Sequence, residues 1–134
     1  MIENITYKKK LFAIIIRSRY LKKQGINFFT SNNLSLQVAY MNHPRNHKIQ
    51  PHIHLKRLKK IYDTNEVLII LEGSMKVDFY DVKKNYLKSK ILNKNDIIIL
   101  IFGAHGFKIK KNCKFIEVKQ GPYLINKDKK KFYN

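Results

Sequence analysis

The apolar residues of this chain recur in short runs, which is typical of β-strands rather than of long helices. Within residues 74–80, Met75, Val77 and Phe79 alternate with polar positions, as expected for a strand with one face in a core and one in water. Clusters of Ser, Asn, Pro and Gly separate the runs, which begin near residues 11, 34, 66, 74, 96 and 114. The pattern predicts an all-β fold of antiparallel strands with little helix.

Two details of this pattern predict how the strands are arranged. Gly73 and Ser74 lie between the runs at 66–71 and 75–80, which predicts a tight hairpin at this point. The run IIILIF at 97–102 is apolar on both faces, so it should be a central strand or a strand that a second subunit covers. Because an exposed two-faced apolar strand promotes aggregation, we expect a homodimer.

Length and composition indicate a single domain. The 134 residues contain no internal repeat or linker, so we expect one domain over 1–134, with a core at about 11–120 and a basic tail at 121–134. Cys113 is the only cysteine, which rules out an intramolecular disulfide. No run reaches the roughly 20 apolar residues that a membrane span needs, and the apolar run after Lys10 is too short for a signal peptide. We therefore expect a cytoplasmic protein that does not enter a membrane.

The net charge of +19 comes from 28 basic and 9 acidic residues. Almost all of the basic residues are lysines, whereas nucleic-acid readers favour arginine for bidentate contacts and aromatic residues for stacking. The composition therefore favours a solvated lysine surface that attracts anionic small molecules over a nucleic-acid interface.

Four side chains form a candidate metal site. His52 and His54 are one residue apart, and in a strand such residues point to the same face, where both can bind one ion. Glu66, at the head of an apolar run, and His105, in FGAHGF, would complete a shell of three imidazoles and one carboxylate. Without a cysteine cluster, these ligands favour one divalent Fe, Mn, Ni or Zn ion.

Simpler interpretations exist for each of these residues. His52 and His54 could be an exposed pair on a polar loop, and Glu66 could pair with a lysine. A carboxylate that begins an inward-facing strand carries a desolvation penalty, however, which a divalent cation offsets. His43 and His47 flank a proline turn and are interpreted as loop residues rather than ligands.

Two further residues are candidates for substrate binding. In a strand, Tyr40 would point to the same face as the apolar residues of its run, and Gln50 would point to the same face as His52. A core tyrosine and a surface glutamine explain the same positions equally well.

The motif residues resemble those of a known family. His52-x-His54, Glu66 followed by six residues and Gly73, and a glycine-bearing loop that ends at His105 are similar to the two motifs of the cupins, over roughly residues 34–120. Eleven residues separate His54 from Glu66, where the family pattern has three or four. The resemblance implies a cupin-type double-stranded β-helix, which is a jelly-roll barrel, and it also implies a dimer.

A metal held in this way would act as a Lewis acid on a carbonyl group. We expect an isomerase-like or epimerase-like enzyme acting on a small carbohydrate or keto acid, and by analogy with sugar-modifying cupins on a sugar phosphate or nucleotide sugar. The sequence does not identify the catalytic residues. Two alternatives remain open, a non-catalytic ligand-binding or regulatory cupin and an Fe(II)-dependent dioxygenase.

Overall fold

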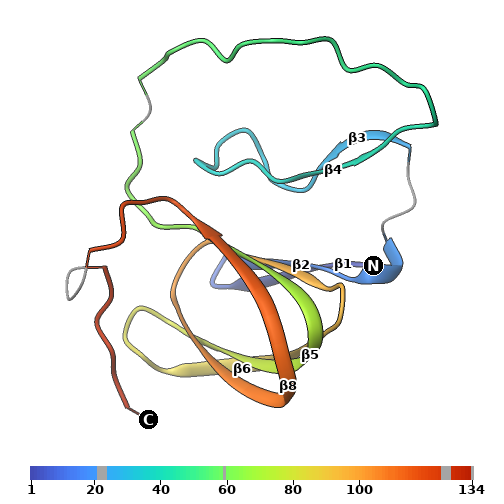
Figure 1. The fold of residues 1–134 in the computed structure, drawn as a ribbon. Coiled ribbons are helices and arrows are strands. Elements are labelled where there is room, and N and C mark those ends of the chain that lie inside the picture. Colours follow the sequence, from blue (N-terminus) through green and yellow to red (C-terminus); the bar gives the residue numbers. More distant parts are fainter. Residues whose placement is uncertain (21–23, 59, 125–127, 134) are drawn as a thin grey trace.

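The structure, a computed structural model, describes residues 1–20, 24–58, 60–124 and 128–133, so part of the predicted tail at 121–134 lies outside the described residues. The chain is all-β and antiparallel, as predicted, with a single turn of 3-10 helix at Ser18–Tyr20 in the described part. One sheet has the strand order β1-β2-β7-β5-β6 with β8 on β5, and β3 and β4 form a second sheet (Figure 1). The strands are β1 (Ile2–Tyr7), β2 (Lys10–Ile16), β3 (Gly25–Phe28), β4 (Ala39–Asn42), β5 (Glu66–Tyr80), β6 (Tyr86–Asn93), β7 (Ile97–Leu100) and β8 (Ala104–Lys119).

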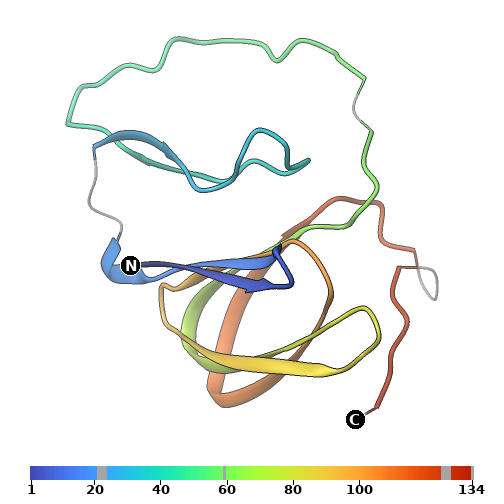
Figure 2. The ribbon, with the colours of Figure 1, turned by 180° about the vertical axis from the view of Figure 1, so that it is seen from behind.

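Strands β5 and β8 pair along nearly their whole length and form a curled ribbon. At one end of β5, Glu66 pairs with Leu100 of β7, and at the other end Tyr80 pairs with Ala104 of β8. Leu100 and Ala104 are only four residues apart, a distance of at most about 14 Å, whereas a straight strand as long as β5 would span about 46 Å. The ribbon must therefore curl and bring the two ends of β5 together, as both views show (Figures 1 and 2).

The curl passes through a bulged region in the middle of β5. The register with β8 shifts at several places between Ile70 and Met75, and Gly73 has a φ of +74°. A Cβ atom on Gly73 would overlap the backbone oxygen of Asn112, so only glycine fits. The predicted hairpin at Gly73–Ser74 is therefore wrong, because this glycine shapes a bulge inside one 15-residue strand.

Buried side chains form two clusters, one on each face of the six-stranded sheet. The inner cluster fills the curl and includes Leu68, Ile70, Ile98 and Leu100. It also contains Met75, Val77 and Phe79, which confirms the predicted alternation in this part of β5. The outer cluster is built on Ile14, Ile16, Val67 and Ile99.

Strand β7 is central, as predicted, because it pairs with β2 on one side and β5 on the other. Its outer face is covered by residues of the same chain, since Phe29, Leu36 and Val38 pack against the outer cluster. The cover that was expected from a second subunit is thus intramolecular here. The homodimer itself stays a prediction.

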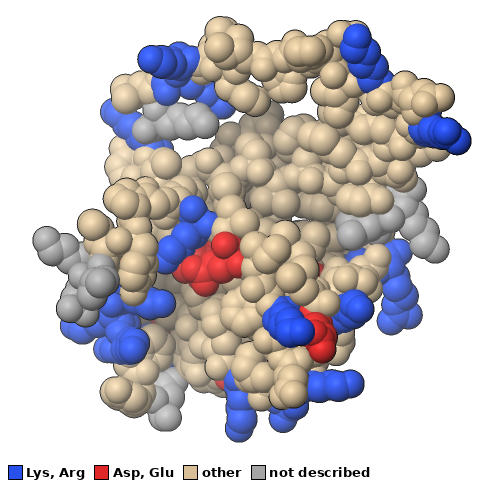
Figure 3. Space-filling model, in the orientation of Figure 1, with Lys and Arg blue, Asp and Glu red and all other residues tan. Residues whose placement is uncertain are grey.

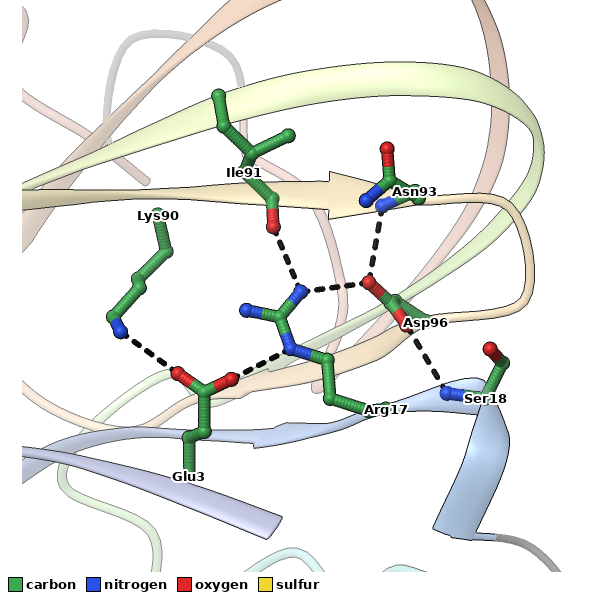
Figure 4. Close-up of polar contacts among 7 residues, drawn as sticks. All are labelled: Glu3, Arg17, Ser18, Lys90, Ile91, Asn93 and Asp96. Atoms are coloured by element: carbon green, nitrogen blue, oxygen red, sulfur yellow. Dashed lines mark hydrogen bonds and ion pairs between the residues drawn. The ribbon is translucent and has the colours of Figure 1, made fainter. Parts of the chain in front are cut away.

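A cluster of charged side chains links strands β1 and β6 (Figure 4). Arg17, just after β2, donates to Glu3 of β1 at 2.7 Å, to the carbonyl oxygen of Ile91 in β6 at 2.8 Å, and to Asp96 at 2.8 Å. Lys90 of β6 donates to the second oxygen of Glu3 at 2.8 Å. These side chains connect β1 to β6, two strands that are at opposite ends of the sheet order.

The connecting segment, residues 43–58 and 60–65, arches over the β3–β4 hairpin (Figure 1). Its described part contains no strand, and nearly all of its side chains are exposed. His52 and His54 therefore do not lie in a strand, the setting in which they would point to one face, because no strand pairs with this segment in the described structure. Separately, no helix within the described residues has the length and apolar character needed to cross a membrane.

Candidate functional site

Glu66 and His105 meet where the two ends of β5 come together. The Nε2 atom of His105 lies 3.0 Å from the Oε2 atom of Glu66. Glu66 pairs with Leu100 and His105 pairs with Phe79, and both of these partners belong to the inner cluster. Because paired residues share a face of the sheet, Glu66 and His105 both point to the inner side. The curl of β5 is what brings these residues together across 39 positions of sequence.

The environment of this pair keeps Glu66 ionised. The side chains of Glu66 and His105 are only 16% and 26% exposed. The hydrogen bond from His105 lowers the pKa of Glu66, burial opposes that shift, and the charges of Lys119 and Lys129 lower the pKa further. The ring of His105 also packs beside Phe107, with the two ring centroids 5.1 Å apart. The site is thus a half-buried carboxylate with an imidazole partner and an apolar neighbour.

His52 and His54 lie elsewhere, on the exposed connecting segment. Their ring centroids are 5.2 Å apart, and Nδ1 of His52 lies 2.9 Å from the carbonyl oxygen of Gln50. Within the described residues, no group of three or more His, Cys, Asp or Glu side chains is placed to hold a metal ion. The structure therefore brings together two of the four predicted ligands, and the metal site stays a prediction.

The predicted substrate-binding residues lie apart from the Glu66–His105 pair along the fold. Tyr40 belongs to β4, in the hairpin region that covers the outer face of the sheet, whereas Glu66 and His105 point to the inner face. Gln50 is exposed on the connecting segment. Their role in substrate binding stays a prediction.

His43 and His47 occupy a turn, as interpreted from the sequence. Their rings stack in parallel with centroids 4.1 Å apart, and the amide of His47 donates to the carbonyl oxygen of Pro44. The Nε2 atom of His43 is buried and lacks a hydrogen-bond partner among the described residues.

Sequence reasoning missed a buried polar cluster that fixes the start of β5. Asn65 is only 3% exposed, and its backbone amide donates to the side chain of Gln120 at 2.8 Å. The Asn65 side chain donates to the carbonyl oxygen of Ile101 and accepts from Ser35. The only signal in the sequence was an asparagine in a turn-forming stretch. This cluster holds the backbone next to Glu66 and so positions its carboxylate.

Lys119 is a second residue that the sequence does not single out, because it alternates with apolar residues as a side chain in water does. It is 16% exposed, and its Nζ atom lies 3.2 Å from Asp128 and 3.8 Å from Glu117. Lys119 thus places a positive charge beside the Glu66–His105 pair.

Elsewhere Lys and Arg are spread over the surface, whereas Asp and Glu gather in a few places on the face shown in Figure 3.

Fold and site together define an all-β protein with a carboxylate–imidazole pair where the two ends of the long, curled strand β5 come together. No protein-family model matches the chain, and neither a curated protein nor a solved structure is significantly similar to it. The resemblance to the cupins therefore rests on the sequence motifs, and membership of that family stays a prediction.

Proposed function

We propose that this protein is a cupin-type protein that binds one divalent transition metal through His52, His54, Glu66 and His105. It would use the metal to act on a small anionic carbohydrate or keto acid. The observation that carries the proposal is the 3.0 Å contact between Glu66 and His105, two motif residues from distant strand ends. In this proposal the connecting segment joins the curled sheet and completes a jelly-roll barrel.

The donor set suits such a metal. A carboxylate and neutral imidazoles are ligands that Fe, Mn, Ni and Zn share. Glu66 and His105 supply one of each, and a group of two leaves the coordination shell incomplete. His52 and His54 would supply the remaining protein ligands.

The connecting segment has both the length and the composition for this movement. Eleven residues lie between His54 and Glu66, so these two residues can be up to about 40 Å apart when the chain is extended. The described part of the segment exposes large apolar side chains, and burying them against the sheet would be favourable. These residues are Ile49, Ile53, Leu55, Leu58, Ile61 and Tyr62, with exposed fractions from 49% to 90%.

The bound metal would supply Lewis-acid stabilisation of negative charge on a carbonyl oxygen, the chemistry of isomerisation and epimerisation of keto sugars. The side chains of the protein supply the charge that holds the metal and the charge that attracts the substrate. Glu66 is held ionised by its contact with His105, so it can offer a full negative charge to a cation. The excess of lysines raises the local concentration of an anionic substrate.

Titration calorimetry with Mn²⁺, Ni²⁺ and Zn²⁺ tests the proposal. We expect one site per chain, and a loss of affinity of at least about tenfold in Glu66→Gln, in His105→Gln and in the double variant His52→Gln/His54→Gln. His47→Gln is the matched control, because it removes a histidine of the same segment that is outside the proposed set. Thermal unfolding of each variant verifies that it is folded.

The variants separate two ways in which the proposal can fail. Unchanged affinity in Glu66→Gln and His105→Gln would show that the half-buried pair binds no metal. A loss confined to these two variants, with the His52/His54 double variant binding like the wild type, would disprove the four-residue set.

A further inference from the structure

A hollow of about 330 Å³ opens at the end of the sheet where the β1–β2 turn and the β5–β6 turn lie together (Figures 1 and 2). Neither Glu66 nor His105 lines it, and no residue of the connecting segment does. Its lining consists of three aromatic residues, three lysines and three others, namely Tyr7, Phe12, Phe102, Lys8, Lys10, Lys83, Asp81, Val82 and Asn85. The hollow is therefore distinct from the site proposed above.

The floor of the hollow is aromatic and well packed. The ring of Phe12 meets Tyr7 and Phe102 edge to face, with centroids 6.2 Å and 5.4 Å apart. Gly103 has a φ of +77°, and a Cβ atom there would overlap the ring of Phe12. The β7–β8 turn thus closes directly on Phe12 and fixes the aromatic residues that line the hollow.

The rim of the hollow is positively charged. The Nζ atom of Lys10 lies 4.4 Å from the centroid of Phe102, and that of Lys8 lies 5.3 Å from the centroid of Tyr7. These cation–π contacts hold both ammonium groups at the edge of the aromatic floor. With Lys83 as the third lysine, the rim favours a negatively charged group.

Asp81, the one acidic residue in this described lining, offsets only part of the positive charge of the three lysines. Its Oδ1 atom accepts the backbone amides of Lys83 and Asn85, and its Oδ2 atom accepts the side chain of Asn85. These hydrogen bonds with Asn85 and Lys83 lower the pKa of Asp81. The carboxylate is thus held by its own turn, and its single negative charge, which interacts with Lys8, leaves the three lysines of the lining in excess.

The two turns that frame the hollow also carry lysines at unfavourable backbone positions. Lys8, Lys9 and Lys84 have φ values of 46°, 62° and 71°, in the left-handed region where glycine or asparagine costs less. Such outliers concentrate at functional sites, where another requirement outweighs local stability. Of the three, Lys8 lines the hollow, and a requirement for positive charge there would account for its position.

We propose that this hollow binds a small anion with an aromatic body, such as an aryl phosphate. Its volume falls within the range of small-molecule pockets, its floor suits a ring, and its lysines suit the anionic group. The inference goes beyond the proposed metal-dependent function and does not depend on it.

The test uses titration calorimetry of the full-length protein in EDTA, with phenyl phosphate as the probe. Benzyl alcohol supplies the ring without charge, and inorganic phosphate supplies the charge without the ring. We expect phenyl phosphate to bind one site per chain, at least about tenfold tighter than either control compound. The EDTA keeps the result independent of any metal.

Variants locate the site. Lys10→Gln and Lys83→Gln should each weaken phenyl phosphate about two- to fivefold, whereas the control Lys94→Gln, at an exposed lysine outside the lining, should not. Val82→Trp places a large ring into the hollow from a position that is 69% exposed, so it should abolish binding without unfolding the protein. Thermal unfolding verifies that each variant is folded.

Three outcomes would overturn the proposal. Benzyl alcohol or inorganic phosphate binding as tightly as phenyl phosphate would show that the aromatic residues and the lysines of the hollow do not act together. An equal loss in Lys94→Gln and Lys10→Gln would indicate attraction to overall charge. Full affinity in Val82→Trp would place the binding outside this hollow.

Discussion

Asp96 shows how a single buried side chain holds distant parts of this chain together. It is 4% exposed, and its two oxygens accept hydrogen bonds from Arg17, Ser18 and Asn93. Arg17 in turn binds Glu3 of the first strand. The sequence indicated only a turn at Asp96 and the end of an apolar run at Arg17. Their contact spans 79 positions, so local pattern could not predict it.

The ion pairs of Glu3 predict a pH dependence of stability. Hydrogen bonds from Arg17 and then Lys90 lower the pKa of Glu3 from 4.5 to about 2. A carboxyl group whose pKa is lower in the folded state stabilises the fold above its ordinary pKa, and this contribution is lost as the pH falls toward the folded value. Urea unfolding of Glu3→Gln should therefore show a loss on the order of 2 kcal/mol at pH 6 that vanishes near pH 2.

The control for this experiment is Glu72→Gln, because the Glu72 side chain is 55% exposed in its pair with Lys114. Exposed pairs of this kind contribute little to stability. A loss in Glu3→Gln that stays the same from pH 6 to pH 2 would contradict the role assigned to the ion pairs.

At the scale of elements, the pattern of apolar residues was the most reliable signal. Short apolar runs predicted the all-β class, alternation predicted the buried face of Met75, Val77 and Phe79, and the two-faced apolar run at 97–102 predicted a central β7, and the structure confirms all three. The hairpin at Gly73 was wrong, because a glycine with positive φ serves a turn and a bulge equally well and the sequence does not distinguish the two. The bulge is recognised only from the structure, in which β8 pairs with β5 on both sides of Gly73.

The two glycines at 73 and 25 allow the bulge to be tested. Both have positive φ, but a Cβ on Gly25 meets nothing within 4 Å, whereas one on Gly73 overlaps the backbone of Asn112. Gly25→Ala should thus cost about 1 kcal/mol of unfolding free energy from backbone strain alone, and Gly73→Ala about 3 kcal/mol or more. Equal losses in urea unfolding would show that the close approach at the bulge does not matter.

At the scale of the whole molecule, the curl of the sheet creates the candidate site. The motif placed Glu66 and His105 at one site, and the structure brings these two residues into contact. His52 and His54 share a face only if they lie in a strand, and the spacing of two histidines does not supply the partner strand that this needs. The long connection between His54 and Glu66 leaves His52 and His54 on the exposed segment, apart from Glu66 and His105.

The central claim is that all four motif residues bind one metal ion, and X-ray absorption spectroscopy of the zinc-loaded protein tests it most directly, because the spectrum reports how many imidazoles surround the metal. We predict three imidazoles together with oxygen ligands in the wild type, and two in His105→Gln under metal concentrations that keep the site loaded. A single imidazole in the wild type, from the Glu66–His105 pair alone, or an unchanged imidazole count in His105→Gln would contradict the account.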